Sequence, residues 1–345
     1  MGGHDVIVVG ASAGGVEALT SMVRGVSPGL PAAIFVVLHI PSDTRSVLPA
    51  ILDRAGPLPA VAAEDLMPIE RGRIYVAPPN RHILVERDRV RVVTGPRENR
   101  VRPSADPLFR SAARQFGRRV VGVVLSGVLD DGANGLAAVA AAGGVTVAQD
   151  PNDALFEGMP RAAAERCRID HLLPAAEIGP LLVELARDDA PTKKGGGADL
   201  SDELMRDPTP DAEPASSADQ KRTGRASGIT CPDCHGSLWE LKDGDAVRYE
   251  CRVGHSYSVD ALLSAQAESL ENALWAALNA LEERAATLDR VAKGVHGRPD
   301  VYGERMREQA REANEQALTL REALLRSIAS HGAASAGSDG PPVTA

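Results

Sequence analysis

A serine, a histidine and a carboxylate each follow an apolar run of strand length. Ser12 lies in GASAGG, between the run VIVVG and the helical pattern VEALTSMV. His39 follows the run AIFVVL, and Asp131 comes shortly after the run VVGVVL. Because the carboxyl ends of parallel strands meet at one edge of a sheet, we expect these three side chains to lie close together. A hydroxyl, an imidazole and a carboxylate form the set that acyl transfer needs, so the pattern predicts a hydrolase site.

The turn around Ser12 is typical of a nucleophile elbow, in which small residues between a strand and a helix expose a serine hydroxyl. The backbone N–H groups of Ala13 and Gly14 fall at the expected helix N-terminus, where such groups hold a developing oxyanion. The catalytic order along the chain would be Ser12, His39, Asp131, whereas an α/β-hydrolase has serine, acid and then histidine. This order disfavours the common hydrolase fold.

Other interpretations of these segments stay open. GASAGG also approaches the dinucleotide-binding pattern G-x-G-x-x-G, except that Ser12 replaces the second glycine, where a side chain would obstruct a pyrophosphate. That fold wants an acidic residue at the end of the second strand, where this chain has His39. A turn of small residues without any ligand is the simplest alternative. Asp130 and Asp131 also suit the start of the helix GLAAVAAAG, so one of them could cap it while the other orients His39.

A second group of reactive residues occupies a short window near the C-terminus. A pair of cysteines with two residues between them is followed by a third cysteine and a histidine, and this pattern matches a two-knuckle zinc ribbon. The segments SLWELKDG and AVRYEC are predicted to form the hairpin between the knuckles. A unit of this size has too small an apolar core to fold unaided, which favours a structural zinc over three ordinary thiols. His235 is a weaker alternative ligand, and Cys167 is expected to be a core thiol. The expected ligands are Cys231, Cys234, Cys251 and His255.

Buried strands and intervening helices are the elements that must position the first site. From about residue 5 to 187, continuous Val- and Ile-rich runs alternate with helical patterns, which predicts an α/β fold with a parallel, doubly wound, Rossmann-like sheet. Between residues 73 and 94 the apolar residues alternate more strictly, which predicts a hairpin on one edge of that sheet.

Composition then divides the chain. A Gly-, Pro- and Ser-rich segment cannot bury enough surface to order itself and is expected to be a disordered linker. Beyond the small cysteine unit, apolar residues with spacings of three and four predict two helices that form a hairpin or short coiled coil, through which a homodimer could form. The expected parts are a catalytic domain at 1–190, a linker at 191–227, a zinc-ribbon-like module at 228–258, a helical hairpin at 259–328 and a flexible tail at 329–345.

The predicted helical stripe is specific enough to be checked. In the first helix its members are Leu263, Ala267, Leu270, Leu274, Ala277, Leu281 and Leu288. A break is expected at 294–299. In the second helix the members are Ala310, Ala313, Ala317, Leu320 and Leu324.

Charge and hydropathy exclude several classes of partner. The chain has 38 basic and 47 acidic residues, a net charge of −9, so it lacks the basic surplus that broad nucleic-acid binding requires. No run reaches the roughly 18 apolar residues that span a bilayer, so no membrane insertion is expected. The N-terminus has no signal-peptide pattern, and we therefore expect a cytoplasmic protein.

The segments GASAGG, LHIP, IYVAPPNRH, RPSADPLFRSAA, LSGVLDDGANG and LFEGMPRAA together resemble, in this order, the catalytic domain of the CheB chemotaxis methylesterases over residues 5 to about 187. The resemblance implies hydrolysis of glutamate methyl esters on methylated chemoreceptors, with release of methanol, and deamidation of receptor glutamines in some members. It implies that Ser12 is the nucleophile, that His39 is the general base and acid, and that Asp131 orients His39. No cofactor is implied for catalysis.

The chain departs from the family pattern in three places. Ser126-Gly127-Val128-Leu129 stands where the family usually has Thr-Gly-Met-Gly. Because the first strand pattern begins at about Asp5, we expect no receiver domain of the kind that usually precedes the esterase, and phosphorylation of an attached receiver is then not the expected switch. The region from residue 228 on lies outside the family domain. Two alternatives to an active esterase are therefore kept: a catalytically silent CheB-like adaptor in a signalling complex, and a nucleotide-binding Rossmann protein.

Overall fold

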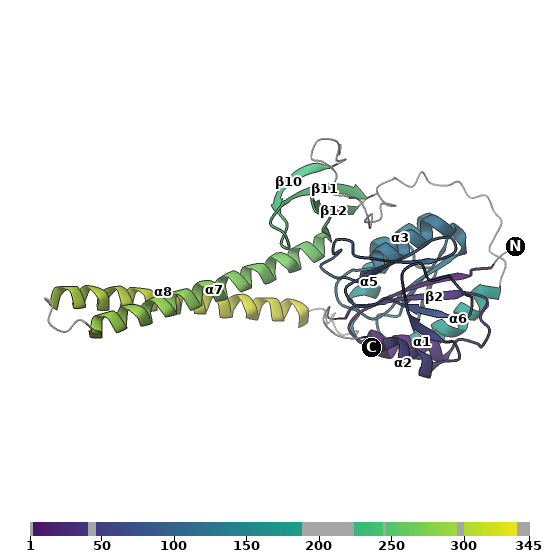
Figure 1. Cartoon of the computed structure of the whole chain (residues 1–345), viewed down its shortest axis with the longest axis horizontal. Helices are drawn as coiled ribbons and strands as arrows, with labels where there is room; N and C mark the ends of the chain where they lie inside the picture. The colour runs from purple at the N-terminus through teal and green to yellow at the C-terminus, as the bar shows by residue number, and fades with distance from the viewer. Residues whose placement is uncertain (1–2, 41–45, 188–223, 244–245, 295–299, 337–345) are drawn as a thin grey trace, which may run out of the picture. The chain divides into compact units, whose positions relative to one another are not determined.

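The computed structural model describes residues 3–40, 46–187, 224–243, 246–294 and 300–336. The chain forms two units, residues 1–262 and residues 263–345. Figure 1 shows the helices and strands of both units coloured along the chain.

The centre of the first unit is a seven-stranded parallel sheet with the strand order β3-β4-β2-β1-β7-β8-β9. Every residue of β1, β2 and β7 is buried, which explains why these strands read as continuous apolar runs. The predicted parallel sheet is therefore confirmed. Its strands are β1 (Val6–Ala11), β2 (Ala33–Leu38), β3 (Ala60–Ala62), β4 (Ile74–Val76), β7 (Val120–Val124), β8 (Val145–Gln149) and β9 (His171–Leu173).

Helices cover both faces of this sheet, as the doubly wound fold requires (Figure 1). Each face has its own apolar core, one built with α1, α2 and α6 and the other with α3, α4 and α5. A short 3-10 turn, Gly117–Arg119, leads from α3 into β7. The helices are α1 (Gly15–Arg24), α2 (Leu48–Ala55), α3 (Ala105–Phe116), α4 (Ala133–Ala141), α5 (Gly158–Arg166) and α6 (Ala175–Arg187).

The predicted hairpin exists, but it is not an edge of the main sheet. Strands β5 (His82–Val85) and β6 (Val90–Val93) pair with each other in a separate two-stranded antiparallel sheet. The preceding segment, β4, lies inside the parallel sheet between β3 and β2. Ile83 and Val85 are buried in the same core as α3, so the hairpin is held by side-chain packing on that face rather than by pairing with the sheet.

The cysteine-bearing module also belongs to the first unit. It is a four-stranded antiparallel sheet in chain order, and the predicted hairpin between the knuckles is β11–β12, with Leu238 opposite Cys251. Its first strand begins at Arg225, inside the segment assigned to the linker at 191–227. Residues 191–223 of that segment lie outside the described residues. The strands are β10 (Arg225–Thr230), β11 (Ser237–Asp243), β12 (Ala246–Cys251) and β13 (Ser256–Ser258).

Two long helices, α7 (Val259–Gly294) and α8 (Asp300–Ala336), form the second unit from Leu263 onward. They pack through a shared apolar stripe, so the predicted helix pairing is confirmed; its members are Leu274, Leu278, Leu281, Ala317, Leu320 and Leu324. In α7 the stripe uses Leu278, whereas the predicted members Leu263, Leu270 and Ala277 are exposed. The break is predicted at 294–299: α7 ends at Gly294, and residues 295–299 lie outside the described residues. Helix α8 continues past residue 328 to Ala336, into the predicted flexible tail, whose residues 337–345 also lie outside the described residues.

Within the described ranges, no helix combines the length and the apolar character needed to cross a membrane.

Candidate active site

Ser12, His39 and Asp131 form one hydrogen-bonded chain at the carboxyl edge of the parallel sheet. Ser12 follows β1, His39 follows β2, and Asp131 lies between β7 and α4. The Oγ atom of Ser12 lies 3.1 Å from Nδ1 of His39, and Nε2 of His39 lies 2.7 Å from Oδ2 of Asp131. The carboxylate can only accept, so Nε2 carries the proton and Nδ1 is free to accept the Ser12 hydroxyl proton. The structure thus brings together all three residues that the sequence singled out.

A tight turn presents Ser12 between β1 and α1. The Ser12 N–H donates to the carbonyl of Ser126 (2.9 Å), and the Gly15 N–H donates back to the carbonyl of Ser12 (2.9 Å). Gly14, between them, has a φ of 71° and caps α1, and a Cβ there would lie 2.7 Å from Oγ of Ser126 and 2.8 Å from Cβ of Leu155. Only glycine fits this position, so the turn fixes where Ser12 stands.

The predicted oxyanion donors lie at the N-terminus of α1. Neither the Ala13 N–H nor the Gly14 N–H has an acceptor among the residues that the structure describes. The carbonyl of Ala13 accepts a hydrogen bond from Oγ of Ser126 (2.8 Å), which holds the peptide between Ser12 and Gly14 in place. Two amides beside the hydroxyl are therefore left for an outside acceptor.

Asp131 is buried and receives four donors. Its Oδ2 accepts from His39 and from the Ala105 N–H (2.6 Å), and its Oδ1 accepts from the Ser104 hydroxyl (2.6 Å) and from Nδ2 of Asn99 (3.4 Å). Burial raises the pKa of Asp131, but the hydrogen bonds from His39, Ala105 and Ser104 outweigh it, and the net pKa lies below the ordinary value. This carboxylate is held ionised and aimed at His39.

Three of these donors were not identified from the sequence. Ser104 and Ala105 stand at the N-terminus of α3, and Asn99 precedes them on the same loop. A serine just before a helical pattern is the ordinary N-terminus signal, so the start of α3 could have been found. Its pairing with Asp131 could not, because the two segments meet only after a crossover.

A second buried acid lies behind Asp131. Asp106 accepts hydrogen bonds from the Gly135 N–H (2.6 Å) and from Nδ2 of Asn99 (3.3 Å). Burial first, and then the negative charge of Asp131, raise the pKa of Asp106 well above its ordinary value. Asn99 therefore stands between two carboxyl groups whose pKa values are shifted in opposite directions.

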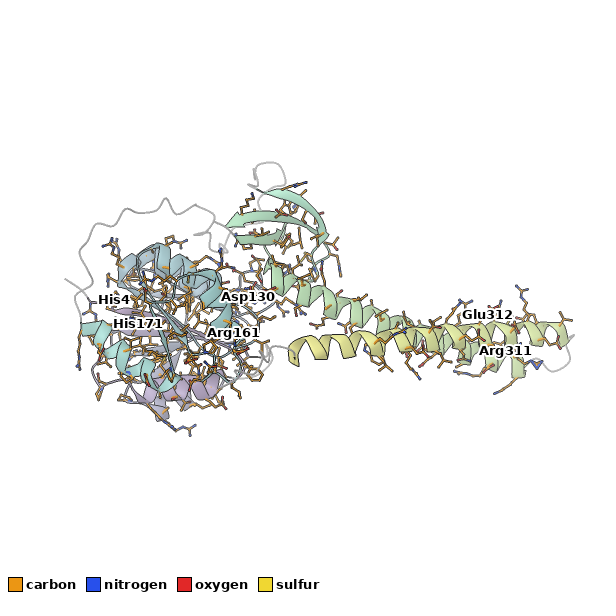
Figure 2. The ribbon with its side chains drawn as sticks, turned by 180° about the vertical axis from the view of Figure 1, so that it is seen from behind. His4, Asp130, Arg161, His171, Arg311 and Glu312 are labelled. Carbon is orange, nitrogen blue, oxygen red and sulfur yellow. The ribbon has the colours of Figure 1, made fainter. Side chains whose placement is uncertain are left out.

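The neighbouring Asp130 has a different environment. The structure corrects the interpretation that one of the two acids caps α4, because the capping residue is Gly132 and no side chain bonds the helix end. Burial raises the pKa of Asp130 to about 6, although a hydrogen bond with Ser258 of the C-terminal module lowers it in part. Figure 2 labels Asp130, which lies on the side of the catalytic domain that meets this module.

The comparison with known families agrees with this geometry. The family model for CheB methylesterase matches residues 7–182, which contain all three members of the hydrogen-bonded chain. The chain belongs to the CheB methylesterase family. This membership also resolves the dinucleotide-binding alternative, since the position where that fold needs an acid holds His39, which is bonded to Ser12 and Asp131.

Several CheB-type proteins are similar over the same region. A protein-glutamate methylesterase/protein-glutamine glutaminase 2 of Anaeromyxobacter dehalogenans is 42% identical over 183 residues, which is 53% of this chain and 54% of that protein. A putative protein of the same description from Leptospira interrogans is 35% identical and is covered over 95% of its length. The CheB methylesterase catalytic domain of Thermotoga maritima is 30% identical, with a TM-score of 0.51 and coverage of 52% of this chain and 98% of that one. The chain spans about half the length of the first curated relatives.

The loop that departs from the usual CheB pattern lies directly against Ser12. Ser126, in the place of the family threonine, supplies the hydroxyl that holds Ala13. A Cβ at Gly127 would fall 2.0 Å from Sδ of Met159 and 2.9 Å from Cβ of Ser12, so this glycine is required by close packing. Val128, in the place of the usual methionine, is half-exposed, so the loop keeps its small residue and its hydroxyl but presents a different apolar surface.

Outside the CheB domain, the four predicted metal ligands converge. Their donor atoms all lie within 4.8 Å of one another, and His235 is not part of the group. The Sγ atoms of Cys234 and Cys251 are 3.6 Å apart, and Nδ1 of His255 lies 3.6 Å from Sγ of Cys231 and 3.5 Å from Sγ of Cys251. A tetrahedral zinc with Zn–S bonds of about 2.3 Å has edges of about 3.8 Å, so the donor set fits zinc. Burial lowers the pKa of His255, which favours the neutral imidazole that binds metal.

Cys167 lies away from this group. It is half-buried in the core on the α3 side, and burial raises the pKa of its thiol to about 11. At neutral pH it is therefore an uncharged thiol in an apolar setting, which agrees with the predicted core position.

Proposed function

We propose that this protein hydrolyses glutamate methyl esters on a methylated chemoreceptor or a related signalling protein. The observation that carries the proposal is the hydrogen-bonded chain from Ser12 through His39 to the buried Asp131, inside a CheB methylesterase domain. Relatives named as protein-glutamate methylesterases are about 40% identical over this domain. The products would be a receptor glutamate and methanol.

In the first half of the reaction, Nδ1 of His39 removes the Ser12 proton while Oγ attacks the ester carbonyl. The proton on Nε2 stays hydrogen-bonded to Asp131, whose lowered pKa keeps it charged and able to stabilise the imidazolium. The Ala13 and Gly14 N–H groups hold the tetrahedral oxyanion. These two N–H groups suit the role because neither donates to any acceptor in the part of the chain that the structure describes.

In the second half, the imidazolium of His39 gives its proton to the departing methoxide, and methanol leaves. Water then attacks the acyl-enzyme with His39 again as base, which frees Ser12 and leaves a receptor carboxylate. The same steps on a glutamine side chain would release ammonia instead of methanol. The relatives that are named protein-glutamine glutaminases support this second activity.

The test is methanol release from a receptor fragment whose glutamates carry methyl esters. We expect the full chain to release one methanol for each carboxylate formed, and ammonia from a fragment that carries glutamines. A silent adaptor would bind the fragment without any turnover, and that result would overturn the proposal.

We propose that the C-terminal module holds one structural zinc, on Cys231, Cys234, Cys251 and His255. Plasma mass spectrometry of the purified full chain should find about one zinc atom per chain, because three thiolates and one imidazole complete the four-coordinate shell of a single zinc ion. Cys231→Ser should lose the metal, since it removes a buried ligand. The matched control, Cys167→Ser, should keep it. Equal zinc contents in the two variants would contradict this assignment.

We propose that a second copy of the chain is a partner of the two long helices. Large apolar side chains stay exposed on the α7/α8 pair, including Leu270 and Trp275 on α7 and Leu318 and Leu325 on α8. Burying them against a copy would remove this surface from water. Light scattering of the full chain should give twice the mass of one chain, and the Trp275→Glu variant should have the mass of a single chain. A wild-type protein that is a monomer at all concentrations would overturn the proposal.

A further inference from the structure

The last strand of the cysteine-bearing module pairs with the loop before α3, which supplies donors to Asp131. Strand β13 begins at Ser256, directly after the expected ligand His255. The Ser256 N–H donates to the carbonyl of Arg97 (3.3 Å), and the Asn99 N–H donates to the carbonyl of Ser256 (2.8 Å). Both partners belong to the first unit, so the module is joined to the catalytic domain by backbone hydrogen bonds.

The side chain of Asn99 continues this connection to the active site. Its Oδ1 accepts the N–H of Ser258 (3.1 Å), so its Nδ2 is the group that faces Oδ1 of Asp131 (3.4 Å) and Oδ2 of Asp106 (3.3 Å). Asn99 is buried, with a φ of 48°, a conformation that asparagine tolerates better than most residues. One carboxamide therefore joins a backbone N–H of the module to the acid that orients His39.

We propose that Asn99 is a positioning residue for Asp131 and that metal binding by the C-terminal module keeps it in place. This inference rests on the proposed esterase function and on the proposed zinc. Two of the four ligands, Cys251 and His255, bracket the turn between β12 and β13, so a metal bound to both fixes the start of β13. Without the metal, β13 loosens, Ser258 no longer holds Asn99, and Asp131 loses one of its donors.

The expected effect is partial, because Ser104 and Ala105 still hold Asp131 when Asn99 is gone. Loss of one hydrogen bond to a charged group corresponds to about a 10- to 100-fold change in rate. The change should fall on kcat rather than on KM, since Asn99 is buried and acts through Asp131 rather than on the substrate.

The experiment compares wild type and Asn99→Ala, each zinc-loaded and chelator-stripped, as full chains. The first readout is the rate of covalent labelling of Ser12 by a fluorophosphonate, followed by intact mass, which needs the serine but no receptor. The second readout is kcat and KM for methanol release. Stripping should slow wild-type labelling about 10- to 100-fold, with recovery on adding zinc, whereas Asn99→Ala should start slow and change less than about twofold on stripping.

A second variant separates positioning from loss of the module. Ser258→Pro removes the N–H that Asn99 accepts, and it should label as slowly as Asn99→Ala while its zinc content stays at the wild-type level. The matched control is Asn279→Ala, an exposed asparagine of α7, which should label at the wild-type rate.

Three results would overturn the inference: stripping that leaves wild-type labelling unchanged, stripping that slows both proteins by the same factor, or a stripped wild type that has lost its far-ultraviolet circular dichroism. Labelling that follows the expected pattern without any methanol release would contradict the proposed receptor esterase function and still support the coupling. The two proposals therefore fail in different ways.

Discussion

Ser12→Ala is expected to lower the rate of methyl ester hydrolysis by about 10⁴-fold or more. The hydroxyl is the atom that attacks, and removing the nucleophile of such a constellation leaves only binding and oxyanion stabilisation. The fold should survive, because Oγ of Ser12 is bonded to His39 alone among the hydrogen bonds described and the side chain is only half-buried. Methanol release and the unfolding temperature, measured on the same preparation, check both expectations.

The control for this change is Ser21→Ala, on the helix that follows the same turn. It removes a hydroxyl of the same size without touching the hydrogen-bonded chain and should retain activity within about twofold. If Ser12→Ala kept more than about a tenth of wild-type turnover, Ser12 would not be the nucleophile and the proposed mechanism would be wrong.

Asp131→Asn is expected to lower kcat by about 10³- to 10⁴-fold. Both carboxylate oxygens accept two donors each, so an amide NH₂ in either place would face two N–H or O–H groups. With its NH₂ at the Oδ2 position, the amide favours the His39 tautomer protonated at Nδ1, the atom that must accept from Ser12. With its NH₂ at the Oδ1 position, the Ser104 hydroxyl can turn to accept, but Nδ2 of Asn99 then meets another donor. In both orientations the neutral amide no longer stabilises the imidazolium. The steady-state rate of methanol release at neutral pH measures the effect.

Asp130→Asn is the matched control, and we expect it to keep activity and gain stability where Asp131→Asn loses activity. Activity should stay within about threefold, because Asp130 lies outside the hydrogen-bonded chain. Burial raises its pKa from 3.8 to about 6, so above pH 6 the charged form destabilises the folded state. Asp130→Asn should therefore unfold at a higher temperature than wild type at pH 8, and the difference should shrink as the pH falls from about 6 to below 3.8, where the acid becomes protonated in the unfolded state as well. Equal loss of activity in both variants would contradict the assigned roles.

The reactive residues could be predicted from the sequence because burial of strands and binding of a metal impose recognisable local patterns on it. Strands buried on both faces appear as unbroken apolar runs, and in a parallel sheet whatever follows those runs gathers at one edge. Ser12, His39 and Asp131 all follow such runs. Two cysteines with two residues between them are equally easy to recognise, because a metal needs both on one short turn.

The helical stripe shows where such patterns stop being enough. Ala277 and Leu278 are adjacent apolar residues, and either fits spacings of three and four. Leu278 is buried in one cluster with Ala317 and Leu324 of α8, whereas Ala277 is exposed. The pattern of a single sequence predicts which face of a helix is apolar, but packing against the partner helix decides which residues of that face are buried.

Tertiary structure alone decided how the catalytic acid is held and which nitrogen of His39 faces Ser12. The donors to Asp131 come from the loop and helix start at 99–105, and Asn99 is itself held by Ser258, 159 positions along the chain. Hydrogen bonds between segments so far apart carry no periodicity that a sequence could show. The apolar pattern determined the sheet, and through it the meeting of a serine, a histidine and an acid. The packing of crossovers and of the added module determined their orientation, because only in the folded chain do distant donors reach one buried carboxylate.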